Sequence, residues 1–189
     1  MRIAIFGGRF DPIHNGHLAV AKEVLAANSA DEVWFSIENQ HQWRPIVANV
    51  AQRKKMVELA ILGEEKMKID MTPVDLGGLT ETITVMHRLQ KKYQEHAFVF
   101  VCGSDQLPTF PKWSHWEELK KEVHFLIVAR KDFPLTNIPV NATVIADPLY
   151  EPLEDSATRI REYRKMGKSI FGLVPKAVED YILEKNLYV

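Results

Sequence analysis

The sequence predicts an α/β protein whose mostly parallel sheet is covered by helices in a three-layer arrangement. Short runs rich in β-branched and aromatic residues alternate along the chain with segments whose apolar residues recur at helical spacing. Roughly 25 residues separate the first two runs, which is enough for the helical crossover between parallel strands. No repeat, low-complexity run or linker divides the chain. We therefore expect one domain over residues 1–189, with 151–189 as a helical C-terminal part.

Each expected element has its own local signal. Asn49 can cap a helix that Gly63 stops, and Pro175 suits the first turn of the last helix. The stretch 75–79 is expected to be a loop. The expected strands cover residues 2–6, 32–37, 68–71, 97–102, 123–129 and 142–146. The expected helices cover residues 18–25, 50–62, 113–121, 156–166 and 175–187, and another begins after Thr80 or Thr82 and ends at Tyr93.

The composition is that of an ordinary globular protein. Apolar residues make up 46% of the chain and charged residues 26%, and the net charge is −1. No global basic field recruits nucleic acid, so an anionic ligand requires a local positive site. Cys102 is the only cysteine, which excludes an internal disulfide and suits a reducing compartment. No apolar run is long enough for a membrane span, and we expect a cytoplasmic protein. A homo-oligomer is compatible with these features.

The first 25 residues carry the strongest signal. A short apolar run ends at Gly7 and Gly8, and an amphipathic helix follows, so the segment between them is a strand-to-helix turn. Open α/β sheets bind ligands at such turns, and the helix N-terminus attracts anions there. His14 and His17 are three residues apart at the helix start and share one face. This pattern favours phosphate binding, although half of a metal site or two capping residues would also use it.

The stretch Gly7-Gly8-x-Phe10-Asp11-Pro12-x-His14-x-Gly16-His17 resembles the signature of the nucleotidylyltransferase superfamily. Within it, the chain is most similar to the bacterial nicotinate-nucleotide adenylyltransferases. The resemblance implies a dinucleotide-binding-like fold and the joining of ATP to nicotinate mononucleotide with release of pyrophosphate. It implies His14 and His17 as catalytic residues. It places Gly7, Gly8, Phe10 and Asp11 at the ATP phosphates. Mg²⁺ would arrive with ATP, because no carboxylate cluster indicates a protein-held metal.

A second signature, Ser156-Ala157-Thr158-Arg159-Ile160-Arg161, opens a later helix. Two hydroxyls, a helix N-terminus and an arginine can together hold a phosphate, although an ordinary N-cap followed by a surface arginine is the simpler interpretation. The segment is similar to the Ser-Ser-Thr-x-Ile-Arg motif with which the family holds the ATP phosphates, with Ala157 replacing the middle serine. The resemblance therefore assigns Ser156, Thr158 and Arg161 to ATP.

Further stretches of the sequence resemble the segments with which the family binds the acceptor nucleotide. A carboxylate after a buried strand can accept hydrogen bonds from ribose hydroxyls, and a tryptophan can line a slot for a pyridine ring. A capping aspartate and a core tryptophan are the alternatives. The residues assigned to the acceptor by resemblance are Arg44, Thr82, Gly103, Asp105, Trp113 and Arg130.

The departures from the family pattern gather on this acceptor side. Arg9 stands where the family has a small residue, and His41-Gln42-Trp43-Arg44 replaces a Pro-Pro-His-cation loop. Glu81 replaces an aromatic residue. Its carboxylate would repel a nicotinate carboxylate if both were desolvated, and the alternative is that it points to solvent. Nucleotidyl transfer is therefore better supported than the acceptor, and nicotinamide mononucleotide and pantetheine phosphate remain alternatives. A non-catalytic nucleotide-binding protein is a third possibility. A dehydrogenase is disfavoured because the turn lacks G-x-G-x-x-G.

Overall fold

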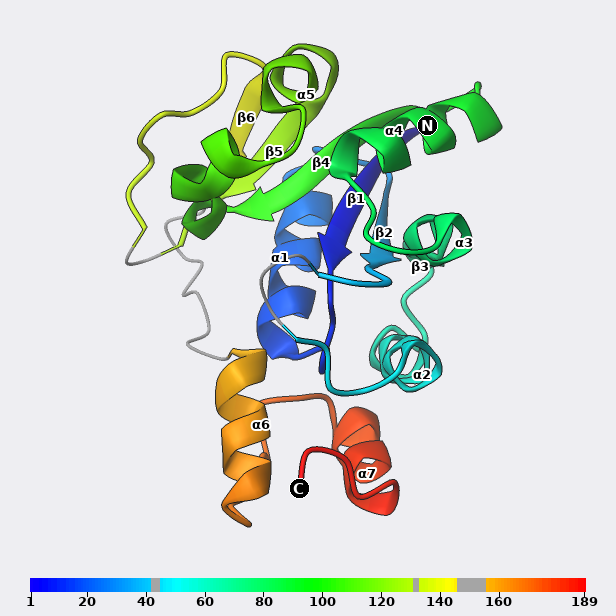
Figure 1. Cartoon of the computed structure of the whole chain (residues 1–189), viewed down its shortest axis with the longest axis vertical. Coiled ribbons are helices and arrows are strands. Elements are labelled where there is room, and N and C mark those ends of the chain that lie inside the picture. Colours follow the sequence, from blue (N-terminus) through cyan, green and yellow to red (C-terminus); the bar gives the residue numbers. More distant parts are fainter. Residues whose placement is uncertain (42–44, 131–132, 146–155) are drawn as a thin grey trace.

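The computed structural model describes residues 1–41, 45–130, 133–145 and 156–189. In this part of the chain six strands form one sheet in the order β3-β2-β1-β4-β5-β6, and every pairing between them is parallel (Figure 1). The strands are β1 (Arg2–Gly8), β2 (Glu32–Ile37), β3 (Met67–Asp70), β4 (Ala97–Gly103), β5 (His124–Val128) and β6 (Ala142–Ile145). The expected α/β fold with a mostly parallel sheet is confirmed.

Helices cover both faces of the sheet. They are α1 (Asn15–Ala26), α2 (Val50–Ala60), α3 (Thr72–Leu76), α4 (Thr82–Lys92), α5 (Trp116–Glu122), α6 (Ala157–Lys165), α7 (Lys176–Glu184) and the 3₁₀ helix η1 (Ser104–Lys112). Successive residues of β1 face opposite sides, as the pleat requires. Ala4 and Phe6 join a core with α1, α2, α6 and α7, whereas Ile3 and Ile5 join a core with α4, η1 and α5. The three layers follow from this alternation.

The chain reverses its direction of travel across the sheet between β1 and β4. From β1 it proceeds outward to β2 and β3, returns to β4 beside β1, and continues to β5 and β6. Such a switch point leaves a crevice at the carboxyl ends of the two central strands, where α/β proteins bind their ligands. Figure 1 shows α6 and α7 beyond the arrowhead of β1, on this side of the sheet. The C-terminal helices also contribute Ile160, Val178 and Ile182 to the core cluster on the α1 face.

Three local predictions differ from the structure. The glycine pair forms the last two residues of β1 instead of following the strand. A Cβ on Gly7 would lie 3.1 Å from Phe100 Cζ, and one on Gly8 would lie 3.0 Å from Phe10 Cζ, so a larger residue at either position would have to displace an aromatic ring. α3 was not expected, and it begins where Asp70 accepts hydrogen bonds from the amide and hydroxyl of Thr72. The expected helix over 113–121 is instead η1 followed by α5.

In the described part of the chain, none of the helices combines the length and the apolar character that crossing a bilayer requires.

Candidate active site

The loop after β1 is fixed by an aromatic cluster. Phe10 has a left-handed backbone conformation with φ 48° and is 1% exposed. Its ring packs edge-on against Phe6, Phe35 and His17, with centroids 5.9, 5.4 and 5.1 Å away. Phe10 was expected at the ATP phosphates, but its ring is part of the core, so only its backbone can approach a ligand. The loop therefore presents the histidines from a rigid base.

His14 and His17 form a stacked pair at the N-terminus of α1. Their ring centroids are 3.7 Å apart with the planes tilted by 32°. The backbone N–H of His14, the N-cap residue, donates a hydrogen bond to Nδ1 of His17 at 3.2 Å. This bond makes Nδ1 of a neutral His17 an acceptor, which assigns its proton to Nε2. His17 therefore has a single N–H to offer a ligand.

Both rings are uncharged at neutral pH. Burial, together with the smaller effect of the positive charge of Arg130, lowers the pKa of His14 from 6.5 to about 3. Burial also lowers the pKa of His17 well below 6.5, with added contributions from His14, Arg130 and Arg9. Nδ1 of His14 is buried and has no hydrogen-bond partner within the described residues. The site thus offers neutral hydrogen-bonding groups at a helix N-terminus, next to two arginines.

Asp11 has a different role from the one expected. The sequence grouped it with the phosphate ligands, but its carboxylate is 1% exposed. Oδ2 accepts the N–H of Val47 at 2.7 Å, and Oδ1 accepts the N–H of Ala48 at 3.0 Å and the hydroxyl of Tyr188 at 2.8 Å. A carboxylate satisfied by three donors and shielded from solvent anchors the loop and does not face the site.

The second signature packs against the first. Arg161 donates from Nη1 to the backbone carbonyl of Asp11 at 2.6 Å and from Nη2 to Oγ1 of Thr158 at 3.2 Å. Ser156 is the N-cap of α6, and its Oγ accepts the N–H of Arg159 at 3.2 Å. These bonds bring residues 150 positions apart to the same loop. Thr158 and Arg161 therefore lie beside the histidine loop, while Ser156 is exposed at the helix start.

The segments after β4 and β5 carry a second group of the predicted residues. Arg130 Nη1 lies 3.1 Å from Oδ1 of Asp105 in a partly buried ion pair. A Cβ on Gly103 would lie only 2.8 Å from Cδ of Arg130, so any larger residue here would displace the arginine side chain. Ser104, which the sequence analysis did not single out, is 0% exposed and fixes the corner. Its Oγ accepts the N–H of Arg130 and donates to the carbonyl of Phe133, both at 2.9 Å.

Trp113 and Thr82 lie on the α4 side of the sheet. Trp113 packs edge-on against Phe100 and Phe110, with centroids 5.8 and 5.0 Å away, and Nε1 donates to Oγ1 of Thr109 at 3.2 Å. The ring is partly exposed, so one face is core and another is accessible. Thr82 is the first residue of α4. Arg44, the remaining acceptor residue of the sequence analysis, lies outside the described residues.

The sequence analysis assigned no role to two ionisable residues near the loop, the buried Arg53 and the half-buried Glu38. Arg53 is 0% exposed and donates to the carbonyls of Arg9 and Ala48 at 2.8 and 3.1 Å. The available signal was that Arg53 occupies the same helical stripe as Met56 and Val57. Glu38, after β2, has a buried carboxylate oxygen with no hydrogen-bond partner in the described chain. Burial raises its pKa to about 7, against the lowering effect of Arg9 and Arg53.

In the part of the chain that the structure describes, no group of three or more His, Cys, Asp or Glu side chains is arranged to hold a metal ion. Arg130 and Arg9 lie close enough to His17 to lower its pKa, and positive charge next to the histidine pair suits an anionic ligand.

Comparison with known proteins identifies the family. Residues 5–163 match the family model described as cytidylyltransferase-like. The chain is 34% identical over 191 residues to the nicotinate-nucleotide adenylyltransferase of Bacillus subtilis (strain 168), covering 99% of this chain and 98% of that protein. It is 36% identical over 190 residues to a probable nicotinate-nucleotide adenylyltransferase of Bacillus cereus (strain B4264), with the same coverage. The chain belongs to the nicotinate-nucleotide adenylyltransferase family.

Solved structures confirm the fold. The nicotinic acid mononucleotide adenylyltransferase of Plasmodium falciparum, complexed with NaAD, superposes with a TM-score of 0.86 at 22% identity, covering 99% of this chain and 97% of that one. The same enzyme complexed with APC superposes with a TM-score of 0.82 at 24% identity and covers 99% and 96%. The nicotinate-nucleotide adenylyltransferase fold is thus retained over the whole chain. As a member of this family the protein is a nucleotidyltransferase.

Proposed function

We propose that the protein joins ATP to nicotinate mononucleotide, releasing pyrophosphate and forming nicotinate adenine dinucleotide. The observation that carries the proposal is the neutral His14–His17 ring pair at the N-terminus of α1, with Arg161 bonded to the preceding loop at Asp11 and Arg130 close enough to lower the pKa of His14. A helix N-terminus and converging arginines suit the phosphates of a nucleotide. The names of the full-length relatives supply the acceptor.

The reaction needs alignment and charge neutralisation more than covalent chemistry. An oxygen of the acceptor's 5′-phosphate attacks the α-phosphorus of ATP in line, a new P–O bond forms, and the bond to the pyrophosphate oxygen breaks. His17 is proposed to donate its Nε2–H to the α-phosphate, and His14 to contact a neighbouring phosphate. Charge that develops on these oxygens is then met by fixed donors. Mg²⁺ carried with ATP would offset further phosphate charge.

The remaining residues hold the two nucleotides. Gly7, Gly8 and the Phe10 backbone, with Ser156, Thr158 and Arg161, form the proposed ATP side. Asp105, set by its ion pair with Arg130, is proposed to accept hydrogen bonds from the acceptor ribose, and Trp113 to pack on the pyridine ring. Asp11 is proposed as a positioning residue, because its carboxylate is fully occupied by Val47, Ala48 and Tyr188.

Pyrophosphate release tests the proposal. ATP and Mg²⁺ are supplied with nicotinate mononucleotide, nicotinamide mononucleotide or pantetheine phosphate in parallel reactions. We expect the highest kcat/KM with nicotinate mononucleotide and formation of a dinucleotide that contains both adenine and the pyridine base. Higher kcat/KM with another acceptor, or no release with any of them, would contradict the proposal.

A further inference from the structure

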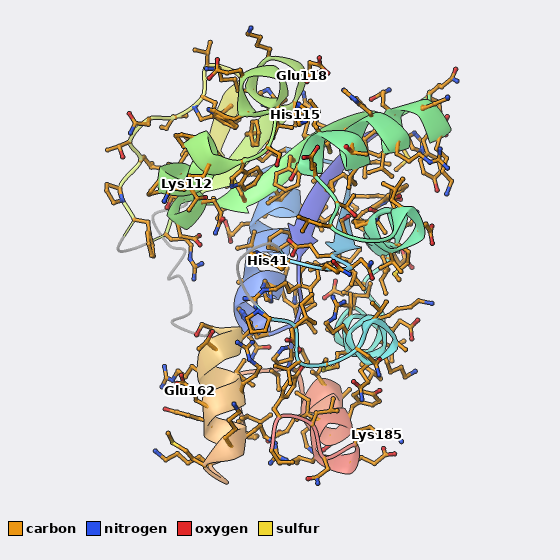
Figure 2. All side chains as sticks on the ribbon, in the orientation of Figure 1. His41, Lys112, His115, Glu118, Glu162 and Lys185 are labelled. Atoms are coloured by element: carbon orange, nitrogen blue, oxygen red, sulfur yellow. The ribbon has the colours of Figure 1, made fainter. Side chains whose placement is uncertain are left out.

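His115 connects two segments that are distant in sequence. It lies between η1 and α5 in a left-handed backbone conformation with φ 54°. Its Nε2 lies 3.4 Å from Oε2 of Glu81, and its Nδ1 lies 3.6 Å from Oε2 of Glu118. Figure 2 shows His115 and Glu118 next to each other at the α5 end of the molecule. Histidine tolerates this backbone region better than most residues do, but the conformation still marks a constrained position.

The two segments both belong to the proposed acceptor side. Glu81 is the N-cap of α4 and directly precedes Thr82. His115 follows Trp113 by two positions, at the end of the segment that leaves β4. Trp113 packs on Phe100, and the Phe100 ring lies against Gly7 of β1, the strand that leads into the histidine loop. The contact between His115 and Glu81 therefore connects the first turn of α4 to the segment that carries Trp113.

We propose that His115 is a positioning residue for the acceptor nucleotide: through Glu81 it holds the first turn of α4 against the segment that carries Trp113. The contact sets the separation of Thr82 from the tryptophan ring, and so the width of the acceptor side. It also directs the Glu81 carboxylate toward α5. The inference rests on the proposed function for the identity of the acceptor, but the contact itself does not.

The expected effect is modest. The side chains of His115 and Glu81 are 57% and 36% exposed. Pairs this exposed are weak, so breaking one leaves the fold intact and changes acceptor binding by about two- to fivefold, equivalent to about 0.4–1 kcal/mol. A change of this size is measurable as a KM for the acceptor.

The test variant is His115→Asn. Asparagine adopts the left-handed conformation readily and is a favoured helix N-cap, so the backbone and α5 are retained while the reach to Glu81 is lost. We expect the KM for the acceptor to rise about two- to fivefold, with kcat and the KM for ATP unchanged. Glu81→Gln should raise the same KM. The acceptor KM of the double variant should be no higher than that of the more affected single variant, because both substitutions remove the same contact between His115 and Glu81.

The chain offers a matched control on the same two helices. His87 of α4 lies 2.6 Å from Glu122 of α5, and both side chains are about half exposed. His87→Gln breaks this pair away from the first turn of α4, and we expect no change in any kinetic constant. An unchanged acceptor KM in His115→Asn, or an equal rise in His87→Gln, would overturn the proposal.

Hydrogen exchange separates the inference from the proposed function. Amides 81–84 and 113–116 should exchange faster in His115→Asn than in the wild type, whichever acceptor the enzyme uses. If exchange is faster in the variant but the wild type is inactive with every acceptor, the proposed function is contradicted, while the role of the contact between His115 and Glu81 is supported. Exchange rates that do not change would overturn the inference even if the wild type uses nicotinate mononucleotide.

Discussion

The hydroxyl of Tyr188 donates a hydrogen bond to Oδ1 of Asp11 at 2.8 Å, across 177 positions of the sequence. The same carboxylate holds the amides of Val47 and Ala48, and Arg161 holds the Asp11 carbonyl. The loop that presents His14 is thus tied to the end of the chain, to the segment before α2 and to α6. The C-terminal part therefore contributes to the order of the active site as well as to the core.

Tyr188→Phe should destabilise the protein by about 1.5–3 kcal/mol, because it removes a hydrogen bond to a buried carboxylate. Burial and the neighbouring Asp11 raise the pKa of Tyr188, so the hydroxyl stays protonated and remains a donor at neutral pH. Urea unfolding measures the free energy. Tyr181→Phe on α7 is the control, since its hydroxyl makes no hydrogen bond with the described residues, and it should cost less than about 0.5 kcal/mol. Equal losses in the two variants would contradict the anchoring role.

Two substitutions of His17 distinguish the roles of its two ring nitrogens, the acceptor Nδ1 and the donor Nε2. His17→Asn can keep an acceptor near the His14 N–H but loses the Nε2 donor, whereas His17→Gln places an amide nitrogen near the Nε2 position. We expect kcat to fall about 10²–10³-fold in His17→Asn, as for the loss of one transition-state donor, and less in His17→Gln. Steady-state pyrophosphate release measures both. The reverse order, or near-normal turnover in a folded His17→Asn protein, would refute the donor role.

Acid should destabilise the fold through His14. Its pKa is about 3 when folded and about 6.5 when unfolded. Above pH 6.5 neither state binds the proton, and between pH 6.5 and 3 only the unfolded chain binds it, so the free energy of unfolding falls as the pH decreases through this window. Between pH 7 and pH 5 we expect wild type to lose about 1–2 kcal/mol more than His14→Asn, which keeps a favourable N-cap and cannot titrate. Urea unfolding at both pH values checks this, and parallel losses would show that His14 does not stay neutral.

The strands, the histidine motif and the Ser156–Arg161 helix could be predicted because each has a local pattern. Hydrophobic runs set β1 and β4, and the spacing of His14 and His17 already places both rings on one helical face. The glycine pair was expected to end the strand, but both residues belong to β1, where Gly7 lies against the ring of Phe100, a residue of β4.

The rest depends on contacts that no local pattern contains. The motif around Asp11 predicts a phosphate-binding residue. Only the packing of the C-terminal end of the chain shows that the Tyr188 hydroxyl donates a hydrogen bond to the Asp11 carboxylate. Ser104 lies between Gly103 and Asp105, the two residues that the resemblance assigned to the acceptor, yet it is Ser104 that holds Arg130 and Phe133 together. Glu81 was expected to face either the acceptor or water, and its neighbour His115 lies 34 positions away in sequence. Side chains whose partners are so distant acquire their roles from tertiary packing.

The discrimination between acceptors should depend only weakly on Glu81. A carboxylate next to the pyridine ring would repel nicotinate and accept a hydrogen bond from nicotinamide, so replacing it could change the preference about tenfold for about 1.4 kcal/mol. In the structure, however, Oε2 of Glu81 lies 3.4 Å from His115. We therefore expect Glu81→Tyr to move the ratio of kcat/KM for nicotinate and nicotinamide mononucleotide toward nicotinate by less than about tenfold.

Both acceptor KM values should rise, because the contact with His115 is lost in either case. Kinetics with the two acceptors in wild type and Glu81→Tyr give the ratio directly. A tenfold or larger shift would place the carboxylate at the pyridine ring and not at His115.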